Sequence, residues 1–367
     1  MKVAMVTPSR KSEKAISGYS EELVKAAKIN KIDMDFVTYE RGLPISFFKL
    51  FPKFKSYDIV HIQHEYNLLG YYGLPYFLIY LYFILPRNYK VITTMHNILP
   101  LNEKFHSNFI KTIFRKLLYI FQNRVINYGS DLIFVHSNFF VPTLVNWYNV
   151  PKRKIVVLPQ GIIEGVKITE KNKAKKSLKI KSNVYLIIGN LQYGKGTDII
   201  VGQADKIGKT LLIASNPDPV NDEKKKRLSG IIENLMREVK HQNLSEYVRF
   251  DISSLNDKMP KWWLYFSAAD FVMLPYRGGI GSGIFTHAIA TKKPVISSSI
   301  PFFTDIEKNY GCIKTAENES NYSRLVHECI KSKNYKKMVK ECERYMKENS
   351  WRAVTKRYKD IYLSLLK

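Results

Sequence analysis

Residues 276–299 read YRGGIGSGIFTHAIATKKPVISSS and come directly after the apolar run FVMLP at residues 271–275. The run predicts a buried parallel strand, the glycines and serine after it a tight turn, residues 284–291 a helix, and residues 294–296 a second strand. Glycines let a backbone approach a ligand closely, a serine can cap a helix, and the first amides of a helix point toward negative charge. The stretch therefore predicts a βαβ unit with an anion site at its centre.

The same stretch lacks a feature that a nucleotide site often has. No acidic residue lies between residues 276 and 299, where a carboxylate that binds a ribose would be expected. The stretch therefore predicts a phosphate site and leaves the sugar contacts open.

The rest of the chain alternates short apolar runs with helical patterns, as α/β proteins with parallel sheets do. A length of 367 residues favours two domains, each large enough for its own core. The expected strands are residues 3–6, 35–38, 59–62, 91–94, 132–135 and 155–158 in the first half, and 185–188, 210–214, 248–251, 271–274 and 294–297 in the second. We expect the α/β class, with two Rossmann-like, doubly wound domains at residues 1–165 and 166–350.

Composition limits the classes of protein to consider. Hydrophobic residues make up 45% of the chain and charged residues 25%, as in soluble globular proteins. The three cysteines lack the spacing of a zinc site or a disulfide framework, which fits a reducing cytosol. The N-terminus becomes charged too early for a signal peptide, so we expect a first strand there.

The net charge of +26 at pH 7 raises the question of a nucleic-acid partner. The basic excess is spread over both halves of the chain and is not gathered in one tail. This spread fits anionic substrates or an anionic membrane surface about as well as nucleic acid, and part of it is a lysine-rich solvated surface. Because no basic stripe stands out, we expect no nucleic-acid partner.

Two segments of the first half bear on a membrane. Residues 67–86 carry no charge and approach the length of a spanning helix, but they join the strands at 59–62 and 91–94, so we expect a buried crossover helix. Residues 104–128 repeat apolar residues at helical spacing, with lysines and arginines between them. This pattern predicts either a helix packed on the sheet with a basic solvated face or one that docks onto an anionic membrane, because amphipathicity alone does not separate the two.

Polar and glycine residues follow the strands on one edge of each expected sheet. Ligands bind beyond the carboxyl ends of the strands in open α/β sheets, so these residues are candidates for a site. They are Ser17, Gly18, Gln63, His64, Glu65, His96 and Asn97 in the first half, and Gly189, Asn190, Lys195 and the turn at residues 278–283 in the second. Two such edges that face each other would form a ligand cleft between the domains.

Each candidate also has a purely structural alternative. Lys195 could be an exposed turn lysine, although its glycine neighbours and its place after a strand favour a phosphate contact. His96 could be a satisfied strand-end histidine, Glu65 a cap for the next segment, and His64 a packing residue. His61 lies inside its strand and is expected in the core.

With these residues in place, the chain resembles glycosyltransferase family 4 of the GT-B enzymes from its first strand to its last helix. The resemblance rests on several pieces that occur in the family's order. They are the opening strand, loop and YSEEL helix, then DIVHIQHEY, ITTMHN, KIVVLPQGI, IIGNLQYGKGTDII, SAADFVMLPY, SGIFTHAIATKKPVI and NSWRAVTKRYKDIY. The last piece is similar to a helix that crosses back to the first domain, here at residues 351–367.

The resemblance implies a retaining transfer of a sugar from a nucleotide-diphosphate donor, UDP- or GDP-linked, with no metal and no further cofactor. Lys195 and the backbone amides around residues 282–284 would stabilise the leaving diphosphate. His96 matches a histidine near the transferred sugar, so His96 and Lys195 are the implied catalytic residues. No dedicated base for a double displacement is evident, which fits attack by the acceptor hydroxyl on the face from which the diphosphate leaves.

The resemblance also implies the remaining contacts. Donor contacts are expected from Asn190, Lys195, Gly279, Gly281, Ser282, Gly283, Ile284 and His287, and acceptor contacts from Gly18, Tyr19, His64, Glu65 and His96. The chain departs from the family pattern at several of these positions. Family members usually carry Arg at the position of Asn190, often carry Glu at those of Gly279 and His287, and have a glycine pair where this chain has Lys14 and Ala15.

Two hypotheses follow. The first is a glycosyltransferase at the cytoplasmic face of a membrane that extends a glycan, on a lipid carrier or free. The second is a catalytically silent GT-B protein that acts as a binding or scaffold subunit, which the departures at Asn190, Gly279 and His287 motivate.

Overall fold

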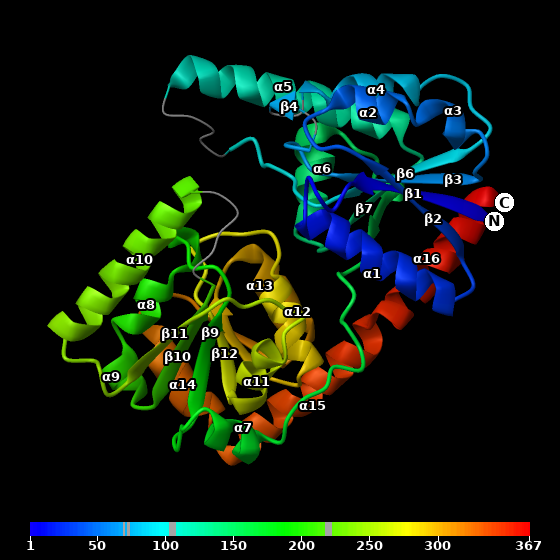
Figure 1. The fold of residues 1–367 in the computed structure, drawn as a ribbon. Helices are drawn as coiled ribbons and strands as arrows, with labels where there is room; N and C mark the ends of the chain where they lie inside the picture. The colour runs from blue at the N-terminus through cyan, green and yellow to red at the C-terminus, as the bar shows by residue number, and fades with distance from the viewer. Residues whose placement is uncertain (69, 72–73, 103–107, 217–221) are drawn as a thin grey trace. The chain divides into compact units, whose positions relative to one another are not determined.

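The computed structural model of the chain describes residues 1–68, 70–71, 74–102, 108–216 and 222–367. These residues form two compact units (Figure 1). The first comprises Met1–Gly161 together with Trp351–Lys367, and the second comprises Ile162–Ser350. The division after residue 161 lies close to the boundary expected at residue 165.

The first unit is built on a six-stranded parallel sheet with the strand order β2-β1-β3-β6-β7-β8. Its strands are β1 (Lys2–Pro8), β2 (Asp33–Tyr39), β3 (Ile59–His64), β6 (Lys90–Met95), β7 (Leu132–Val135) and β8 (Ile155–Val157). The six strands predicted for the first half are therefore confirmed. The strand order changes direction at β1 and β3, and this is where a doubly wound sheet opens a crevice for a ligand.

Helices cover both faces of this sheet, with α4 and α5 on one side and α1 and α16 on the other (Figure 1). The helices are α1 (Ala15–Ile29), α2 (Pro44–Phe48), α3 (Phe51–Phe54), α4 (Tyr76–Tyr82), α5 (Phe109–Gly129), α6 (Phe140–Tyr148), the short 3₁₀ turn at Lys152–Lys154, and α16 (Trp351–Leu366). Because both faces are covered, the inner strand β3 is buried at every residue, whereas the edge strand β2 mixes buried and exposed residues.

The C-terminal helix α16 packs against α1, at the other end of the sequence. The hydroxyls of Tyr358 and Tyr19 lie 3.0 Å apart, and the Tyr362 hydroxyl lies 2.5 Å from Nδ1 of the buried His61. A Cβ on Gly161 would lie 2.2 Å from the ring of Trp351, so only glycine lets the chain pass the start of this helix. The helix thus completes the core of the first unit.

The segment at residues 67–86 differs from the expected crossover helix. It contains two short strands, β4 (Gly70–Tyr71) and β5 (Leu74–Pro75), and then the seven-residue helix α4, while residues 69 and 72–73 lie outside the described part. Ile79 and Tyr80 of this helix are buried, but Leu78 and Leu81 are exposed. None of the helices in the described ranges is long and apolar enough to cross a membrane.

The helix predicted at residues 104–128 is α5, which begins at Phe109; Phe105 and the rest of residues 104–107 lie outside the described residues. The apolar residues of its first half are exposed, with Phe109 and Leu117 at 76% and 60%, whereas Val125 and Ile126 near its end are buried. The helix therefore packs on the first unit through its second half. The alternative in which Phe109, Ile113 and Leu117 pack on the sheet is wrong, because all three are exposed.

The second unit has its own six-stranded parallel sheet, in the order β11-β10-β9-β12-β13-β14. Its strands are β9 (Val184–Ile188), β10 (Thr210–Ser215), β11 (Val248–Ile252), β12 (Phe271–Leu274), β13 (Val295–Ser298) and β14 (Ile313–Ala316). The five predicted strands are confirmed, and the edge strand β14 was missed. The order reverses between β9 and β12, so the loops after these two strands lie at the switch point.

The helices of the second unit complete the α/β alternation that the sequence predicted. They are α7 (Lys171–Ser177), the 3₁₀ turn η2 (Tyr193–Lys195), α8 (Thr197–Val201), α9 (Ala204–Ile207), α10 (Asp222–His241), α11 (Pro260–Ala268), α12 (Gly283–Ala290), α13 (Pro301–Asn309), α14 (Asn321–Cys329) and α15 (Ser332–Asn349).

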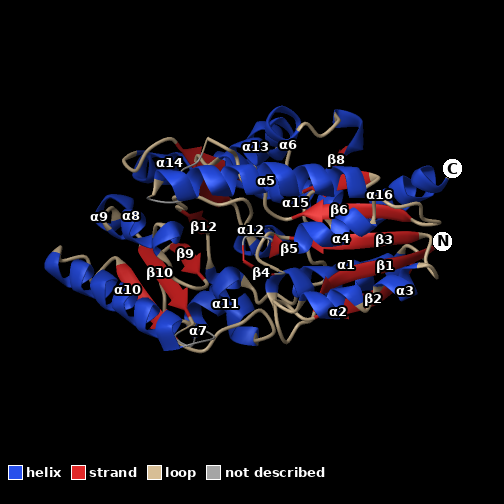
Figure 2. Cartoon of the chain, turned by 90° about the horizontal axis from the view of Figure 1, so that it is seen from above, coloured by secondary structure: helices blue, strands red, loops and turns tan. Residues whose placement is uncertain are grey.

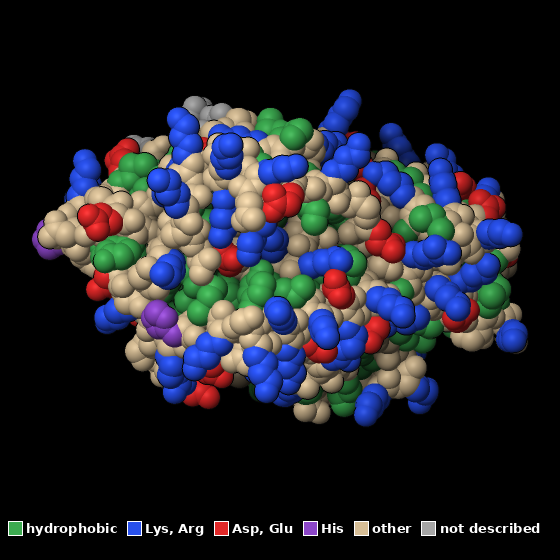
Figure 3. Space-filling view, turned by 90° about the horizontal axis from the view of Figure 1, so that it is seen from below, with side chains coloured by type: hydrophobic (Ala, Val, Ile, Leu, Met, Phe, Trp, Pro, Cys, Tyr) green, Lys and Arg blue, Asp and Glu red, His purple; other side chains and the backbone are tan. Residues whose placement is uncertain are grey.

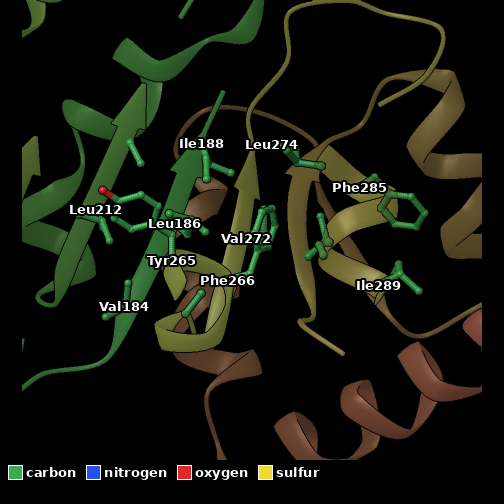
Figure 4. Close-up of a cluster of buried hydrophobic side chains, with 14 of the residues drawn as sticks. Val184, Leu186, Ile188, Leu212, Tyr265, Phe266, Val272, Leu274, Phe285 and Ile289 are labelled. Carbon is green, nitrogen blue, oxygen red and sulfur yellow. The ribbon is translucent and has the colours of Figure 1, made fainter. Parts of the chain in front are cut away.

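The core of this unit lies on both faces of its sheet. Leu186 and Ile188 of β9 point to one face, where they share a cluster with Phe285 and Ile289 of α12 (Figure 4), while Ile187 points to the other. Replacing a buried phenylalanine such as Phe285 by alanine usually lowers the free energy of unfolding by about 3–5 kcal/mol. This packing holds the N-terminus of α12 at the edge of the sheet.

The surface charge is dispersed. On the face shown in Figure 3, lysine and arginine side chains are scattered and acidic side chains lie among them. On this face the arrangement agrees with a solvated lysine-rich surface better than with a nucleic-acid stripe.

We predict that Gly161→Ala destabilises the first unit by about 1–3 kcal/mol, the usual range for overpacking, because the new methyl group overlaps the Trp351 ring. The matched control is Gly230→Ala in α10, where a Cβ would meet no described atom within 4 Å and helix propensity favours alanine. Thermal unfolding measures both variants. Equal melting temperatures for Gly161→Ala and the parent chain would contradict the packing of α16.

Candidate functional site

The opening stretch of sequence forms the expected turn and helix. Helix α12 begins at Gly283, and the Ser282 side chain caps it by accepting a hydrogen bond from the Phe285 amide at 3.2 Å. The Tyr276 hydroxyl lies 3.0 Å from Oγ of Ser282, so the end of β12 supports the cap. The cap and the first amides of α12 give the turn the partial positive charge of a helix N-terminus.

The turn has open space around it. A Cβ on Gly278, Gly281 or Gly283 would meet no described atom within 4 Å. Gly279 has a φ of +148°, a conformation that residues with a Cβ rarely adopt. A glutamate at this position, where the family often has one, would therefore be strained in the backbone conformation that Gly279 adopts.

The loop after β9 carries Lys195 to this turn. Gly196 has a φ of +63°, and a Cβ on it would lie 1.9 Å from the carbonyl oxygen of Pro275, so only glycine permits this contact. The Lys195 Nζ lies 3.7 Å from the centroid of the Tyr276 ring. Lys195, Tyr276 and Ser282 are thus in sequential contact, with the Tyr276 side chain between the Lys195 ammonium and the cap of α12.

Arg277, a residue that was not predicted from the sequence, holds the same loop in place. Its guanidinium donates to both carboxylate oxygens of Asp198, at 2.8 and 2.5 Å, and to the Tyr193 carbonyl at 2.9 Å. Hydrogen bonding to Arg277 holds the pKa of Asp198 below its usual range. An arginine directly after a strand-end tyrosine was visible in the sequence, but its acidic partner was not.

Asn190 and Ile284 also lie near the turn. Asn190 is exposed, two residues after the end of β9. Ile284 approaches the neighbouring residue, because its Cδ1 lies 3.4 Å from where a Cβ on Gly189 would stand. The second unit therefore brings together the predicted donor residues that follow β9 and β12.

His287 lies one turn further along α12, against the aromatic residues of α11. The indole N–H of Trp262 donates to Nδ1 of His287 at 3.3 Å, and the Trp263 ring lies 5.1 Å away. Burial lowers the pKa of His287, so the neutral ring dominates at pH 7 and carries its proton on Nε2. His287 can donate one hydrogen bond where a glutamate would accept one.

In the first unit, His96 belongs to a chain of side chains at the carboxyl edge of the sheet. Its Nε2 lies 2.8 Å from Oε1 of Gln63, and its Nδ1 lies 3.3 Å from Nε2 of His136. Nδ1 of His136 lies 3.0 Å from the Leu158 carbonyl oxygen. Both nitrogens of His96 are thus engaged by protein groups, and His136 is a member of the site that the sequence analysis missed.

These contacts define how the pair carries its protons. The Leu158 carbonyl only accepts, so neutral His136 is protonated on Nδ1, and its unprotonated Nε2 faces Nδ1 of His96. The Gln63 side chain turns its oxygen to His96 and donates from its nitrogen to Sδ of Met5 at 3.0 Å, so neutral His96 carries its proton on Nε2 and donates it to that oxygen. One added proton completes the chain, because it supplies the hydrogen bond between the two imidazole rings. Burial lowers the pKa of both histidines and favours the neutral arrangement at pH 7.

Tyr19 supports the two histidines and is itself buried. Its ring lies 5.0 Å from that of His96 and 5.2 Å from that of His136, and its hydroxyl meets Tyr358. Gly18 lies beside Arg10, since a Cβ on it would be 3.3 Å from the guanidinium. Burial raises the pKa of Tyr19 well above its usual value, so the side chain is a neutral packing group.

His64 and Glu65 follow the structural alternatives that the sequence left open. His64 is buried beside Tyr66, with ring centroids 5.3 Å apart, and burial lowers its pKa to about 3. Glu65 accepts hydrogen bonds from the backbone and side-chain amides of Asn67, at 3.0 and 3.3 Å, and so caps the next turn. His61 lies in the core, as predicted.

The N-terminus of α1 holds a carboxylate from the chain itself. Glu13 accepts hydrogen bonds from the amides of Ala15, Ile16 and Ser17, at 2.9, 2.7 and 3.2 Å. Lys14, between them in sequence, is exposed. In the first loop, where the family has a glycine pair, this chain supplies its own anion.

A metal centre is not evident in the part of the chain that the structure describes, where His, Cys, Asp and Glu residues form no group of three that could hold an ion.

The comparisons with known proteins agree with this architecture. Residues 2–164 match the family model described as Glycosyltransferase Family 4. No curated protein has a sequence that matches the chain. The match covers the N-terminal part of the first unit and confirms the resemblance over those residues.

Solved structures match both units. A glycosyltransferase from Rickettsia africae is 15% identical with a TM-score of 0.65, covering 100% of this chain and 98% of that one. Anabaena HepE, in complex with UDP and glucose, is 12% identical with a TM-score of 0.68 over 99% and 100% of the two chains. Sucrose-phosphate synthase from Thermosynechococcus elongatus is 17% identical with a TM-score of 0.69 over 100% and 99%. At these identities the likeness establishes the fold, which is that of the GT-B glycosyltransferases.

We predict that His136 carries its proton on Nδ1 and His96 on Nε2 at pH 7, because the Leu158 carbonyl and the Gln63 oxygen only accept hydrogen bonds. In Gln63→Leu, His96 loses this acceptor and is expected to move its proton to Nδ1, where Nε2 of His136 accepts it. Long-range ¹H–¹⁵N correlation spectra of the imidazole rings distinguish these tautomers. The control is His241→Ala at the end of α10, and a tautomer of His96 that is the same in all three proteins contradicts the relay.

Proposed function

We propose that this chain, whose first unit matches glycosyltransferase family 4 and whose fold is that of the GT-B enzymes, is a retaining glycosyltransferase. It transfers a sugar from a nucleotide-diphosphate-sugar to a glycan or a lipid-linked acceptor. The donor is UDP- or GDP-linked, and the reaction needs neither a metal ion nor a further cofactor.

The observation that carries the proposal is the contact chain from Lys195 through Tyr276 to the Ser282 cap of α12. It places an ammonium group one tyrosine side chain away from a helix N-terminus, with open space over the glycine turn. Both groups attract a diphosphate, and the site lies at the switch point of the second sheet. The binding of UDP by the Anabaena relative supports a nucleotide donor.

The chemistry assigned to this site is stabilisation of the leaving group. The bond between the sugar C1 and the diphosphate oxygen breaks, and the acceptor oxygen bonds to C1 on the same face. The proton of the acceptor hydroxyl passes to the departing phosphate oxygen, so no separate base is needed. Lys195 and the amides of residues 282–284 offset the negative charge that develops on the diphosphate, which is the role that a metal ion has in other transferases.

The remaining donor contacts are assigned by position. Asn190 and Gly279 line the diphosphate side, and His287 donates its Nε2–H to a ribose oxygen in place of a carboxylate that would accept from a ribose hydroxyl. Trp262 holds the ring of His287 in the orientation for that bond.

The acceptor side is assigned to the first unit. His96 contacts the transferred sugar, and its two engaged nitrogens fix the ring for that contact. Gly18 lies in the first turns of α1 and Glu65 directly after β3, so both follow strands at the switch point of the first sheet. Tyr19 and His64 are buried and act through packing behind these two residues. The proposed location is the cytoplasmic face of a membrane, where a lipid-linked acceptor is available.

The second candidate is a catalytically silent GT-B-like binding subunit. The carboxylate of Glu13 at the N-terminus of α1 favours it, because this carboxylate occupies an anion position of the first loop. The two functions differ in turnover. A silent subunit binds nucleotide without releasing sugar from any donor.

We predict that UDP or GDP raises the melting temperature of the protein and that ADP does so less. A ligand at 100 times its Kd stabilises the folded state by about 2.7 kcal/mol, enough for a clear shift. Thermal unfolding in millimolar nucleotide is the measurement, followed by release of sugar from the matching nucleotide-sugar. No shift with any nucleotide contradicts both candidates, and a shift without turnover on any donor and acceptor contradicts the enzyme.

We predict that Lys195→Ala lowers kcat by about 10²–10³-fold, the usual loss when one preorganised contact to a developing charge is removed. The melting temperature without ligand should change little, since Lys195 contributes only a cation–π contact to the fold. The matched control is Lys206→Ala, an exposed lysine in α9 of the same unit. An unchanged kcat in Lys195→Ala would remove this residue from the mechanism.

A further inference from the structure

Helix α5 has its amphipathic pattern turned outward. Its most exposed apolar residues include Phe109, Ile110, Phe114 and Leu117, at 76%, 75%, 61% and 60% exposure. The buried side of the helix holds Thr112, Gln122 and Asn123, and its buried apolar residues, Tyr119, Val125 and Ile126, occur only from the middle of the helix onward. At 3.6 residues per turn, Thr112, Gln122 and Asn123 lie on the side opposite Ile110, Phe114 and Leu117. A surface helix normally buries its apolar side, so this arrangement needs an apolar environment outside the first unit.

Specific contacts hold α5 in this orientation. The Tyr66 hydroxyl donates to the Asn123 side chain at 3.0 Å, and the rings of Tyr66 and Tyr119 lie 4.8 Å apart. A Cβ on Gly129 would lie 2.7 Å from the carbonyl oxygen of Tyr80, so the end of α5 is pressed against α4. Rotation of the apolar side inward would break these contacts. The exposed side is therefore a fixed surface of the first unit.

Helix α4 and the residues after it extend this surface. α4 and α5 pack together and lie side by side in both views of the chain (Figures 1 and 2). We call the combined surface the α4–α5 apolar face. It consists of Leu78, Leu81, Ile84, Leu85, Phe109, Ile110, Ile113, Phe114, Leu117 and Phe121. Contiguous exposed apolar surface from two elements marks an interaction site on a soluble protein.

The charges of α5 identify the partner. Four residues of Phe109–Gly129 are charged, and all four are basic: Lys111, Arg115, Lys116 and Arg124. Helical spacing puts Lys111 and Lys116 at the two borders of the apolar side and Arg124 within it. Long basic side chains can place their charge at lipid headgroups while their neighbours enter the acyl region. A second copy of the chain would bring like charges together, which disfavours a symmetric dimer through this face.

We propose that the α4–α5 apolar face docks onto an anionic membrane surface, with α5 lying in the plane of the interface. Phe109, Ile110, Phe114 and Leu117 enter the boundary between headgroups and acyl chains, and the basic residues contact anionic headgroups. In the proposed function this surface presents the first unit to a lipid-linked acceptor. The docking rests on α4 and α5 alone and stands even for a chain without transferase activity.

Vesicle co-sedimentation of the full chain tests the proposal. Vesicles of phosphatidylcholine with phosphatidylglycerol are compared with phosphatidylcholine alone, at low and high salt. The chain should bind the anionic vesicles and lose affinity with salt, because surface attraction is screened. No binding to either vesicle overturns the proposal.

Two variants separate the parts of the surface. Phe114→Ser with Leu117→Ser removes two inserted side chains and should weaken binding to anionic vesicles about 10–100-fold, by the usual transfer energies. Lys111→Ala with Lys116→Ala should weaken binding to anionic vesicles and leave any binding to neutral vesicles unchanged. Ile168→Ser, at an exposed apolar residue of the second unit, is the matched control. Because all these side chains are exposed or partly exposed, the melting temperature should stay the same.

Two further readouts make each outcome decisive. Size-exclusion chromatography with light scattering measures the mass of the free chain, and a dimer that Phe114→Ser with Leu117→Ser dissociates, without vesicle binding, shows contact between copies instead and overturns the proposal. Nucleotide-induced thermal shifts of the same variants should match the parent chain. Vesicle binding without any nucleotide-induced thermal shift supports the docking proposal and contradicts the proposed transferase function. A nucleotide-induced shift without vesicle binding contradicts only the docking proposal.

Discussion

The close approach of Gly196 to the Pro275 carbonyl is the constraint on which the candidate donor site depends. It presses the loop after β9 onto the end of β12, at the one place in the second sheet where the strand order reverses. Arg277 and Asp198 then lock the loop from outside. Lys195 reaches the Tyr276 ring only because Gly196, the next residue, has no side chain between the loop and Pro275.

The strands were predictable because a parallel sheet covered on both faces requires unbroken apolar runs. The edge strand β14 escaped because Lys314 and Thr315 interrupt its run, and an edge strand is only half buried. Helix α5 was located correctly but not oriented, since periodicity shows that two sides differ and not which side faces inward. That choice was made by Tyr66 and Tyr80, which are remote in sequence.

The parts of the site that depend on local backbone conformation were predictable. The parts that depend on side-chain contacts between distant residues were less so. The glycine turn and the Ser282 cap follow from local sequence rules. His136, Arg277 and Glu13 were missed because each matters through a group brought near by folding: the ring of His96, the carboxylate of Asp198, and the amides of α1. Gly279 shows a further limit. From the sequence, Gly279 indicates only that a glutamate is missing. Its φ of +148° shows that the backbone at this position has a conformation that favours glycine.

The position of α16 has a consequence for how the protein is made. On a ribosome the second unit emerges whole, while the first waits for Tyr358 and Tyr362 to close over Tyr19 and His61. At about 5–20 residues per second, the first sheet spends tens of seconds in the cell with one face unfinished. The histidine and tyrosines that α16 later buries are exposed to solvent during that time. A chaperone that protects them would have to stay bound while almost the whole second unit is synthesised.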